Sequence, residues 1–180
     1  MSLRVLGITQ KPGTAFGVEP DGYVLWLRRS DYGSLRLGGL KERFSLYSDN
    51  GEYPDGVPIK GTVTEIFIEE EDRSFVGLTP VITFTAPPHW SLAVNSSTNG
   101  IPCLDLPPRS SSRLEVPTRA QVSNRSVTLF FCEHPPMAVH ELRWGDMRFF
   151  VNQVGELEGV TYAGLSDRDL ENLARTEQAS

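Results

Sequence analysis

The stretch "DMRFFVN", residues 146–152, decides the fold of this chain. The apolar side chains of Met147, Phe149 and Val151 stand at every second position, and the polar Asp146, Arg148 and Asn152 occupy positions between and beside them. Successive side chains of a β-strand point to opposite faces of a sheet, so this alternation is typical of a strand with one buried face. The segment therefore predicts a half-buried β-strand.

The same two-residue period recurs along the chain. It is clearest in "SVTLFFC" at 126–132 and "HWSLAVN" at 89–95, and shorter runs repeat it at 4–9, 23–29, 34–37, 44–47, 62–68, 75–78 and 139–144. About ten short strands, separated by turn signals at a spacing of roughly 8–12 residues, are typical of two packed sheets or a barrel. We therefore predict an all-β fold.

Turn chemistry marks the connections between these runs. The run "IEEEDRSF", residues 68–75, places charged residues between two apolar segments, which predicts a hairpin with a solvated, charged tip. We expect long loops at 48–58 and 104–125. A polar loop is also expected at 95–100, where the strand at 89–95 gives way to residues that end in Gly100.

One helix is marked at the C-terminal end. Ser166 is followed three residues later by Asp169, which is close to the capping-box pattern that begins a helix. Leu165 and Leu170 occupy the two flanking positions that pack together across such a cap. We therefore predict one short helix over 167–175.

Length, charge and cysteine content limit the class of protein. The chain has 180 residues, and we expect one β domain over 1–165 followed by the helix and tail over 166–180. The formal net charge of −6 argues against a bulk electrostatic grip on nucleic acid. Apolar runs are too short to span a bilayer, no signal-peptide pattern is present, and two cysteines are too few for a disulfide framework. A cytoplasmic protein that binds neither nucleic acid nor membrane is expected.

The densest group of potential metal ligands is "CEHPPMAVHE", residues 132–141. Its histidines, His134 and His140, are separated by a Pro-Pro pair, and the spacing matches no familiar zinc site. We therefore predict no metal and no cofactor. A metal-dependent cupin-like enzyme that uses His134 and His140 remains an alternative.

Arginines and hydroxyl groups mark two segments that could hold a phosphate. In "PRSSSR", residues 108–113, Arg109 and Arg113 can present guanidinium groups to an anion, and the strand-end pair Arg28-Arg29 has similar potential. Neither a nucleophile elbow nor a phosphate-binding glycine loop is present. The predicted ligand-binding residues, taken from the expected loops at 95–100 and 108–113, are Asn95, Ser96, Ser97, Arg109 and Arg113.

Residues 87–152 resemble the second half of the dUTPase and dCTP-deaminase family. The stretches that carry the resemblance are "PPHWSLAV" (87–94), "NSSTNG" (95–100), "NRSVTLFFC" (124–132) and "LRWGDMRFF" (142–150). Ser96 and Ser97 match the family's Arg-Ser-Ser phosphate motif, but Asn95 replaces the arginine, and the acidic residue that activates water has no counterpart near 122–124. The resemblance implies a β-clip-like barrel and oligomerisation as in that family, but not nucleotide hydrolysis.

With no complete catalytic set, the strand pattern favours a non-enzymatic β-rich binding or structural module. The first alternative is a nucleotide- or sugar-phosphate-binding enzyme of dUTPase-like shape, which would use Ser96, Ser97 and the loop with Arg109 and Arg113. The second is the cupin-like enzyme. The partners left open are a second copy of the chain in a homo-oligomer, a small molecule, and a protein that adds a strand to an exposed sheet edge.

Overall fold

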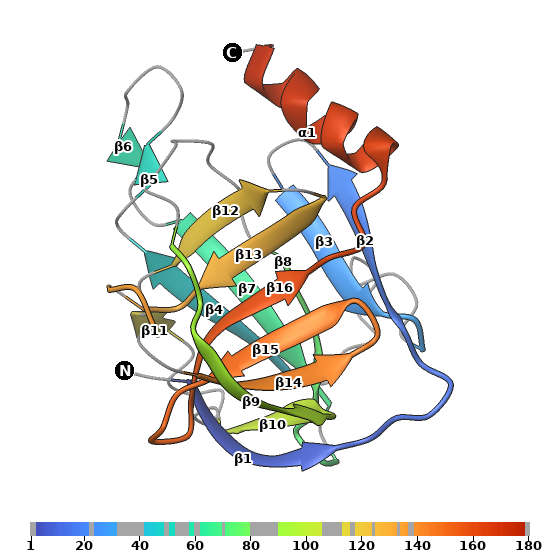
Figure 1. The fold of residues 1–180 in the computed structure, drawn as a ribbon. Coiled ribbons are helices and arrows are strands. Elements are labelled where there is room, and N and C mark those ends of the chain that lie inside the picture. Colours follow the sequence, from blue (N-terminus) through green and yellow to red (C-terminus); the bar gives the residue numbers. More distant parts are fainter. Residues whose placement is uncertain are drawn as a thin grey trace.

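The computed structural model describes residues 3–21, 24–31, 42–48, 51–52, 58–59, 62–69, 71–79, 90–105, 113–115, 118–123, 125–132, 134–136 and 139–178. Over these residues the chain forms sixteen β-strands and one α-helix, so the predicted all-β fold with one C-terminal helix is confirmed. Figure 1 shows two curled sheets, one in front of the other, with the helix beside one end of them.

The larger sheet has eight strands and lies in front in Figure 1. Its main path runs β10-β1-β16-β15-β14-β9, and β13 pairs with β16 and β12 beside that path. Its pairs are antiparallel except for β9 and β14, which run parallel. The strands are β1 (Leu3–Thr9), β9 (Val94–Asn99), β10 (Ile101–Asp105), β12 (Arg119–Ser123), β13 (Ser126–Phe130), β14 (Val139–Trp144), β15 (Met147–Val151) and β16 (Glu156–Tyr162).

The smaller sheet has six strands in the order β11-β4-β7-β8-β3-β2, and a separate two-stranded ribbon pairs β5 with β6. In the smaller sheet β11 and β4 run parallel and the other pairs are antiparallel. The strands are β2 (Phe16–Asp21), β3 (Val24–Arg29), β4 (Glu42–Ser48), β5 (Gly51–Glu52), β6 (Pro58–Ile59), β7 (Thr62–Ile68), β8 (Phe75–Thr79) and β11 (Arg113–Glu115).

Strands β9 and β10 form one stretch of chain with a corner at Gly100. β9 runs along β14, and β10 leaves the corner along β1, so this stretch links the two ends of the strand path and the sheet curls into a half-barrel (Figure 1). A Cβ at position 100 would lie only 2.1 Å from Cγ2 of Ile8. Glycine therefore permits the close approach that the corner requires.

The hydrophobic core lies between the two sheets. Phe16 and Phe75 of the smaller sheet meet Phe149 of the larger one edge-on, with ring centroids 6.2 and 5.2 Å from that of Phe149. Burial of apolar area between sheets is the main stabilising contribution in a fold of this kind. The buried cluster draws on both sheets and includes Leu25, Leu27, Ile66 and Leu78 as well as Leu3, Leu129, Leu142 and Val160.

Many of the predicted strands are confirmed. The alternating stretch at 146–152 forms β15, and Met147, Phe149 and Val151 all belong to the buried cluster. The hairpin at 68–75 is confirmed as well, because β7 and β8 pair across it. The candidate strand at 34–37 lies outside the described residues.

The segment at 89–100 differs from its prediction. Residues 90–93 are not in a strand, whereas Val94–Asn99, expected mostly as a loop, forms β9. All six side chains of β9 are exposed, so no pattern of buried residues marks it. Backbone hydrogen bonding to β14, which depends little on side-chain type, decides this strand.

Other segments expected as loops also contain strands. The described part of 104–125 includes β11 and β12, and that of 48–58 includes β5 and the start of β6. The sequence offers no prediction for β16, because Gly159 interrupts its apolar pattern. This strand nevertheless pairs with β1, β13 and β15.

The capping box of the C-terminal helix is confirmed in detail. The Ser166 hydroxyl accepts a hydrogen bond from the Asp169 N–H at 3.2 Å, and the Asp169 carboxylate accepts one from the Ser166 N–H at 2.8 Å. Leu165 is buried and Leu170 packs against the same core. The helix, α1 (Asp167–Gln178), continues past the predicted end at 175. No described helix is long and apolar enough to cross a membrane.

Candidate functional site

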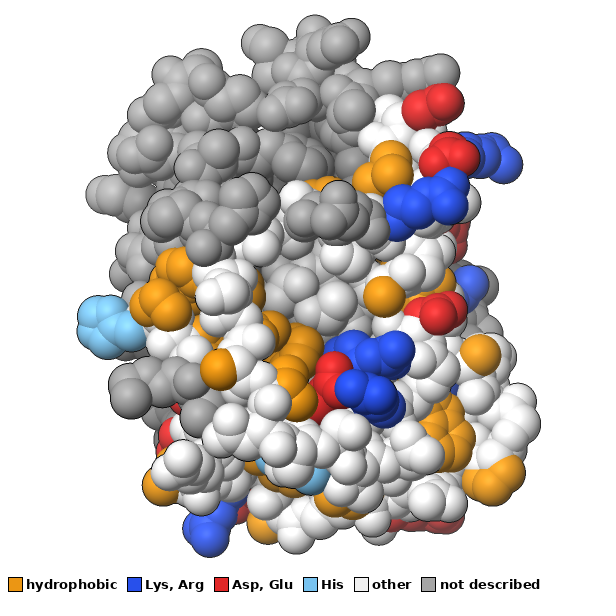
Figure 2. All heavy atoms as spheres, viewed as in Figure 1, with side chains coloured by type: hydrophobic (Ala, Val, Ile, Leu, Met, Phe, Trp, Pro, Cys, Tyr) orange, Lys and Arg blue, Asp and Glu red, His pale blue; other side chains and the backbone are white. Residues whose placement is uncertain are grey.

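A line of polar residues crosses the outward face of the larger sheet. Residues that pair directly across neighbouring strands lie on the same face. Successive pairings join one polar residue from each of six strands, from β12 to β9: Gln121, Thr128, Thr161, Arg148, Arg143 and Asn99. We call this line the polar row. Figure 2 views the same face and shows basic side chains beside an acidic one near its centre.

An apolar shelf lies beside the polar row. In the next line of pairs on the same face, Gly159 stands between Phe130 and Phe150. A Cβ at position 159 would lie 2.8 Å from the Leu129 carbonyl oxygen, so glycine permits the close approach of β13 here. Trp90 packs on Phe130 with ring centroids 5.1 Å apart, and the backbone N–H of Trp90 donates to the Gln121 side-chain oxygen at 3.0 Å. Trp90 therefore covers this outer shelf, and it is not part of the predicted strand or of the core between the sheets.

The hairpin between β14 and β15 positions two arginines of the polar row. Its turn consists of Gly145 and Asp146 alone, and Gly145 has a φ of 58°, a positive value that glycine adopts readily in such turns. A two-residue turn places Arg143 directly opposite Arg148. Like charges in directly opposite positions destabilise a sheet, so their repulsion has to be offset. We call these two residues the arginine pair.

Glu141 offsets part of this repulsion. Its side chain is 9% exposed, and its carboxylate accepts a hydrogen bond from Nε of Arg143 and lies 3.7 Å from Nε of Arg148. Nη1 of Arg148 also donates to the carbonyl oxygens of Gly145 and Met147 at 2.6 and 2.9 Å. One carboxylate thus serves two guanidinium groups, which leaves one net positive charge. Among the described residues, neither terminal nitrogen of Arg143 has a hydrogen-bond partner.

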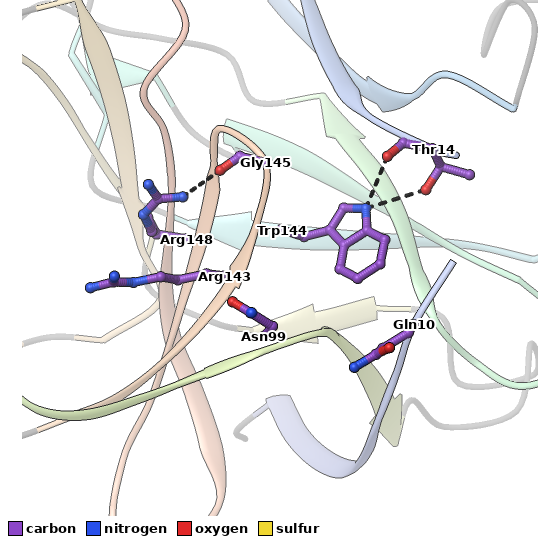
Figure 3. Close-up of a pocket in the computed structure, with 7 residues that line it drawn as sticks. All are labelled: Gln10, Thr14, Asn99, Arg143, Trp144, Gly145 and Arg148. Atoms are coloured by element: carbon purple, nitrogen blue, oxygen red, sulfur yellow. Dashed lines mark hydrogen bonds between the residues drawn. The ribbon is translucent and has the colours of Figure 1, made fainter. Parts of the chain in front are cut away.

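An open pocket of about 540 Å³ adjoins the arginine pair. In Figure 3, Arg143 and Arg148 extend side by side, while Trp144 points the other way, toward Thr14. The indole N–H of Trp144 donates to the Thr14 carbonyl oxygen at 3.1 Å, which ties the segment after β1 to the hairpin. The volume suits a small molecule or one part of a larger ligand. The lining residues are Gln10, Thr14, Asn99, Arg143, Trp144, Gly145 and Arg148.

The residues predicted to bind a ligand are distributed over different sheets. Asn95, Ser96 and Ser97 lie on β9 of the larger sheet with exposed side chains. Arg113 begins β11 in the smaller sheet, and Arg109 lies outside the described residues. Strand pairing therefore does not join the two segments. Ser97 pairs in register with Glu141 and so lies next to the arginine pair.

His134 and His140 do not form a complete catalytic or metal site with the other described residues. Nδ1 of His140 is 2.7 Å from the Ser96 hydroxyl. A nucleophilic serine also needs a group that orients the histidine, and no described residue bonds the other ring nitrogen of His140. His134 is exposed. The described residues contain no group of three or more His, Cys, Asp or Glu side chains that could hold a metal ion, and Glu133 is not among them.

A second charged cluster, which we call the Arg29 network, lies at the end of β3. The Arg29 side chain is fully buried and donates to the carboxylates of Asp31 at 2.7 Å and Glu69 at 2.8 Å. It also donates to the Ser74 hydroxyl at 3.2 Å. These partners come from the chain itself, so Arg29 is not accessible to a phosphate, contrary to its suggested potential.

Lys11 extends this network to the tip of the β7–β8 hairpin. Its ammonium lies 3.0 Å from the Glu69 carboxylate and 2.8 Å from that of Asp72. Burial favours a raised pKa for Asp72, but hydrogen bonds from Lys11 and Ser74 outweigh it and lower the pKa to about 2. Burial likewise opposes the lowered pKa of Glu69, and hydrogen bonds from Arg29 and Lys11 outweigh it. Two carboxylates of the hairpin, Glu69 and Asp72, are therefore ion-paired, which the prediction of a solvated tip did not include, while Glu71 is exposed as expected.

The arginine pair was not among the predicted site residues, although "RWGDMR", residues 143–148, contains a signal for it. Gly-Asp is a strong two-residue turn signal, and the residues two positions outside such a turn face each other. No family model matches the chain, and no curated protein matches its sequence. The resemblance to the dUTPase family therefore stays a prediction.

Proposed function

We propose that this chain is a non-enzymatic binding module that holds an anionic ligand at the arginine pair. The observation that supports the proposal is a charge imbalance: Arg143 and Arg148 face each other, and Glu141 is the carboxylate that they share among the described residues. Guanidinium groups donate parallel hydrogen bonds that match carboxylate and phosphate oxygens. An anion bound here would relieve the repulsion between the two arginines and use the free nitrogens of Arg143.

The surroundings of the arginine pair also favour ligand binding. Asn99 and Gln10 add amide groups to the pocket, and Thr161, the next member of the polar row, adds a hydroxyl group that pairs with Thr128 at 2.6 Å. Several convergent polar groups beside an apolar surface are the usual composition of a ligand site. We therefore expect the pocket and the polar row to contact the same ligand.

A nucleotide- or sugar-phosphate-binding enzyme of dUTPase-like shape is the second candidate. The same arginine pair favours it, because phosphate is a preferred partner of guanidinium groups. The two candidates differ in turnover: a binding module returns its ligand unchanged, and an enzyme does not. Incubation with nucleotides and Mg²⁺, followed by chromatography of the products, separates them.

Thermal-shift measurements with tripolyphosphate, citrate and ATP test the main proposal. The Arg143→Ala/Arg148→Ala variant is compared with Arg4→Ala/Arg168→Ala, which removes the same charge from two exposed positions elsewhere. An anion at 100 times its Kd should stabilise the wild-type chain and the control by about 2.7 kcal/mol. The double variant at 143 and 148 should lose this stabilisation. Equal stabilisation of both variants, or none with any of the three anions, would contradict the proposal.

Assembly and location follow as lesser parts of the proposal. A cytoplasmic location is supported by Cys103 and Cys132, which are both free thiols. A homo-oligomer, which the family resemblance implies, should show a mass above 20.0 kDa by light scattering after size exclusion. A mass of 20.0 kDa at all concentrations would contradict the oligomer and leave the binding site unaffected.

A further inference from the structure

β9 is a sheet edge without the usual protection against further pairing. Edge strands commonly carry charges or prolines, which discourage the addition of another strand. β2, at an edge of the smaller sheet, contains Pro20 and two acidic residues, and β10 contains Pro102 and Asp105. β9 has the sequence VNSSTN, with no charge and no proline, and all six side chains are exposed. Within the described structure it pairs on one side only, with β14.

The other side of β9 presents backbone groups that suit an added strand. The N–H of Gly100 donates to the Arg143 carbonyl oxygen on β14 at 2.9 Å. Both backbone groups of a strand residue point to one side, and the side alternates from each residue to the next. Ser97 and Asn99 therefore direct their N–H and C=O groups away from β14. Each of these two residues can exchange hydrogen bonds with an incoming strand.

The arginine pair supplies a charge for one side chain of that strand. Asn99 is in register with Arg143, so the residue opposite Asn99 on an added strand would continue the polar row. Neighbouring strands are about 4.8 Å apart, which puts its Cα about 10 Å from that of Arg143. Arginine and glutamate side chains together span this distance on the shared face. A carboxylate there would meet the free nitrogens of Arg143.

We propose that the ligand of this module is an acidic peptide segment in extended conformation, which adds to the free side of β9 and places a carboxylate at the arginine pair. This inference rests on the proposed function, because both use the same two arginines. A second copy of the chain fits less well, since its own β9 carries no carboxylate to offer Arg143. Main-chain hydrogen bonds provide the affinity, and the charge provides the preference for acidic sequences.

Fluorescence anisotropy with short, end-blocked, labelled peptides tests the inference. Four peptides of equal length are compared: alternating Thr and Glu, alternating Thr and Lys, and two forms of the Thr-Glu peptide with N-methyl groups on alternate residues, one for each phase of the alternation. The full chain is used as wild type, as Ser97→Pro and as Ser97→Ala. Proline removes the outward N–H of Ser97 without altering a group that pairs with β14, and alanine keeps that N–H.

The Thr-Glu peptide should bind the wild type and Ser97→Ala alike, and Ser97→Pro about tenfold more weakly. The Thr-Lys peptide and at least one N-methylated peptide should bind about tenfold more weakly than the Thr-Glu peptide. If Ser97→Pro does not fold, the N-methylated peptides carry the test alone. Binding of tripolyphosphate without a preference for the Thr-Glu peptide would overturn the peptide inference and leave the anion site standing. Failure of tripolyphosphate and both charged peptides would overturn both.

Discussion

The Arg29 network and the arginine pair contain the same kinds of side chain but differ in charge balance and exposure. Arg29 is fully buried and its bonded carboxylates belong to the chain, whereas the side chains of Arg143 and Arg148 are 50% and 30% exposed. Arg29 is bonded to two carboxylates, those of Asp31 and Glu69, but the two residues of the arginine pair share Glu141 alone among the described residues. A cluster whose partners are all internal can only stabilise the fold. A surface cluster with more guanidinium groups than carboxylates can bind an anionic group.

The largest effect is expected at Arg29. Arg29→Met removes the guanidinium group from the carboxylates of Asp31 and Glu69, and loss of one partner from a buried pair costs about 3–5 kcal/mol. We expect the free energy of unfolding in urea to fall by about 3 kcal/mol. Arg28→Met is the control, because Arg28 is half-buried and lies 3.9 Å from an exposed Glu19. Equal losses in both variants would remove the distinction between the closed network and an ordinary surface charge.

A smaller effect is expected at Glu141. Glu141→Gln keeps the shape and removes the negative charge between the two guanidinium groups, so the anion affinity of the arginine pair should rise about tenfold, or 1.4 kcal/mol. The gain should shrink as salt is added, because ions screen exposed charges. Titration with tripolyphosphate at low and high salt measures both effects. Glu19→Gln makes the same change in net charge on β2, and an equal gain in that variant would show that overall charge alone controls the affinity.

The smallest effect is expected at Asp72. Its folded-state pKa of about 2 lies below the usual 3.8, so its stabilising contribution is complete above pH 4 and is lost as the pH falls toward 2. Asp72→Asn should lower stability at pH 5 by about 1 kcal/mol or less, since the group is a third exposed. The difference from wild type should disappear near pH 2. Urea unfolding between pH 5 and pH 2 measures it, and Lys11→Met should remove only part of this pH dependence, because Ser74 also bonds the Asp72 carboxylate.

A good part of the β architecture could be predicted from local patterns. Met147, Phe149 and Val151 alternate because β15 has one buried face, and alternation is visible in any half-buried strand. β9 and β16 could not be found in this way. β9 buries none of its side chains, and Gly159 breaks the pattern of β16. Both are strands because neighbours distant in the sequence supply backbone partners.

The candidate site could be predicted only in part. The Gly-Asp turn in "RWGDMR" is enough to place Arg143 opposite Arg148, since a two-residue turn sets the register. The burial of Arg29 could not be predicted from local sequence, because its partner Glu69 lies forty residues further along the chain. The sequence predicts Ser97 as a ligand-binding residue because it matches a phosphate motif, and the structure adds its place on β9 beside the arginine pair.

The sequence by itself determined the all-β class, the hairpin at 68–75 and the cap of the C-terminal helix. These features depend on side-chain alternation, turn preferences and contacts within a few residues, all of which are local. Only the tertiary structure decided that Arg29 is enclosed, that Arg143 and Arg148 face solvent, and that β9 pairs on one side only among the described residues. Burial and edge position depend on which distant segments fill the neighbouring space, and no local pattern specifies that.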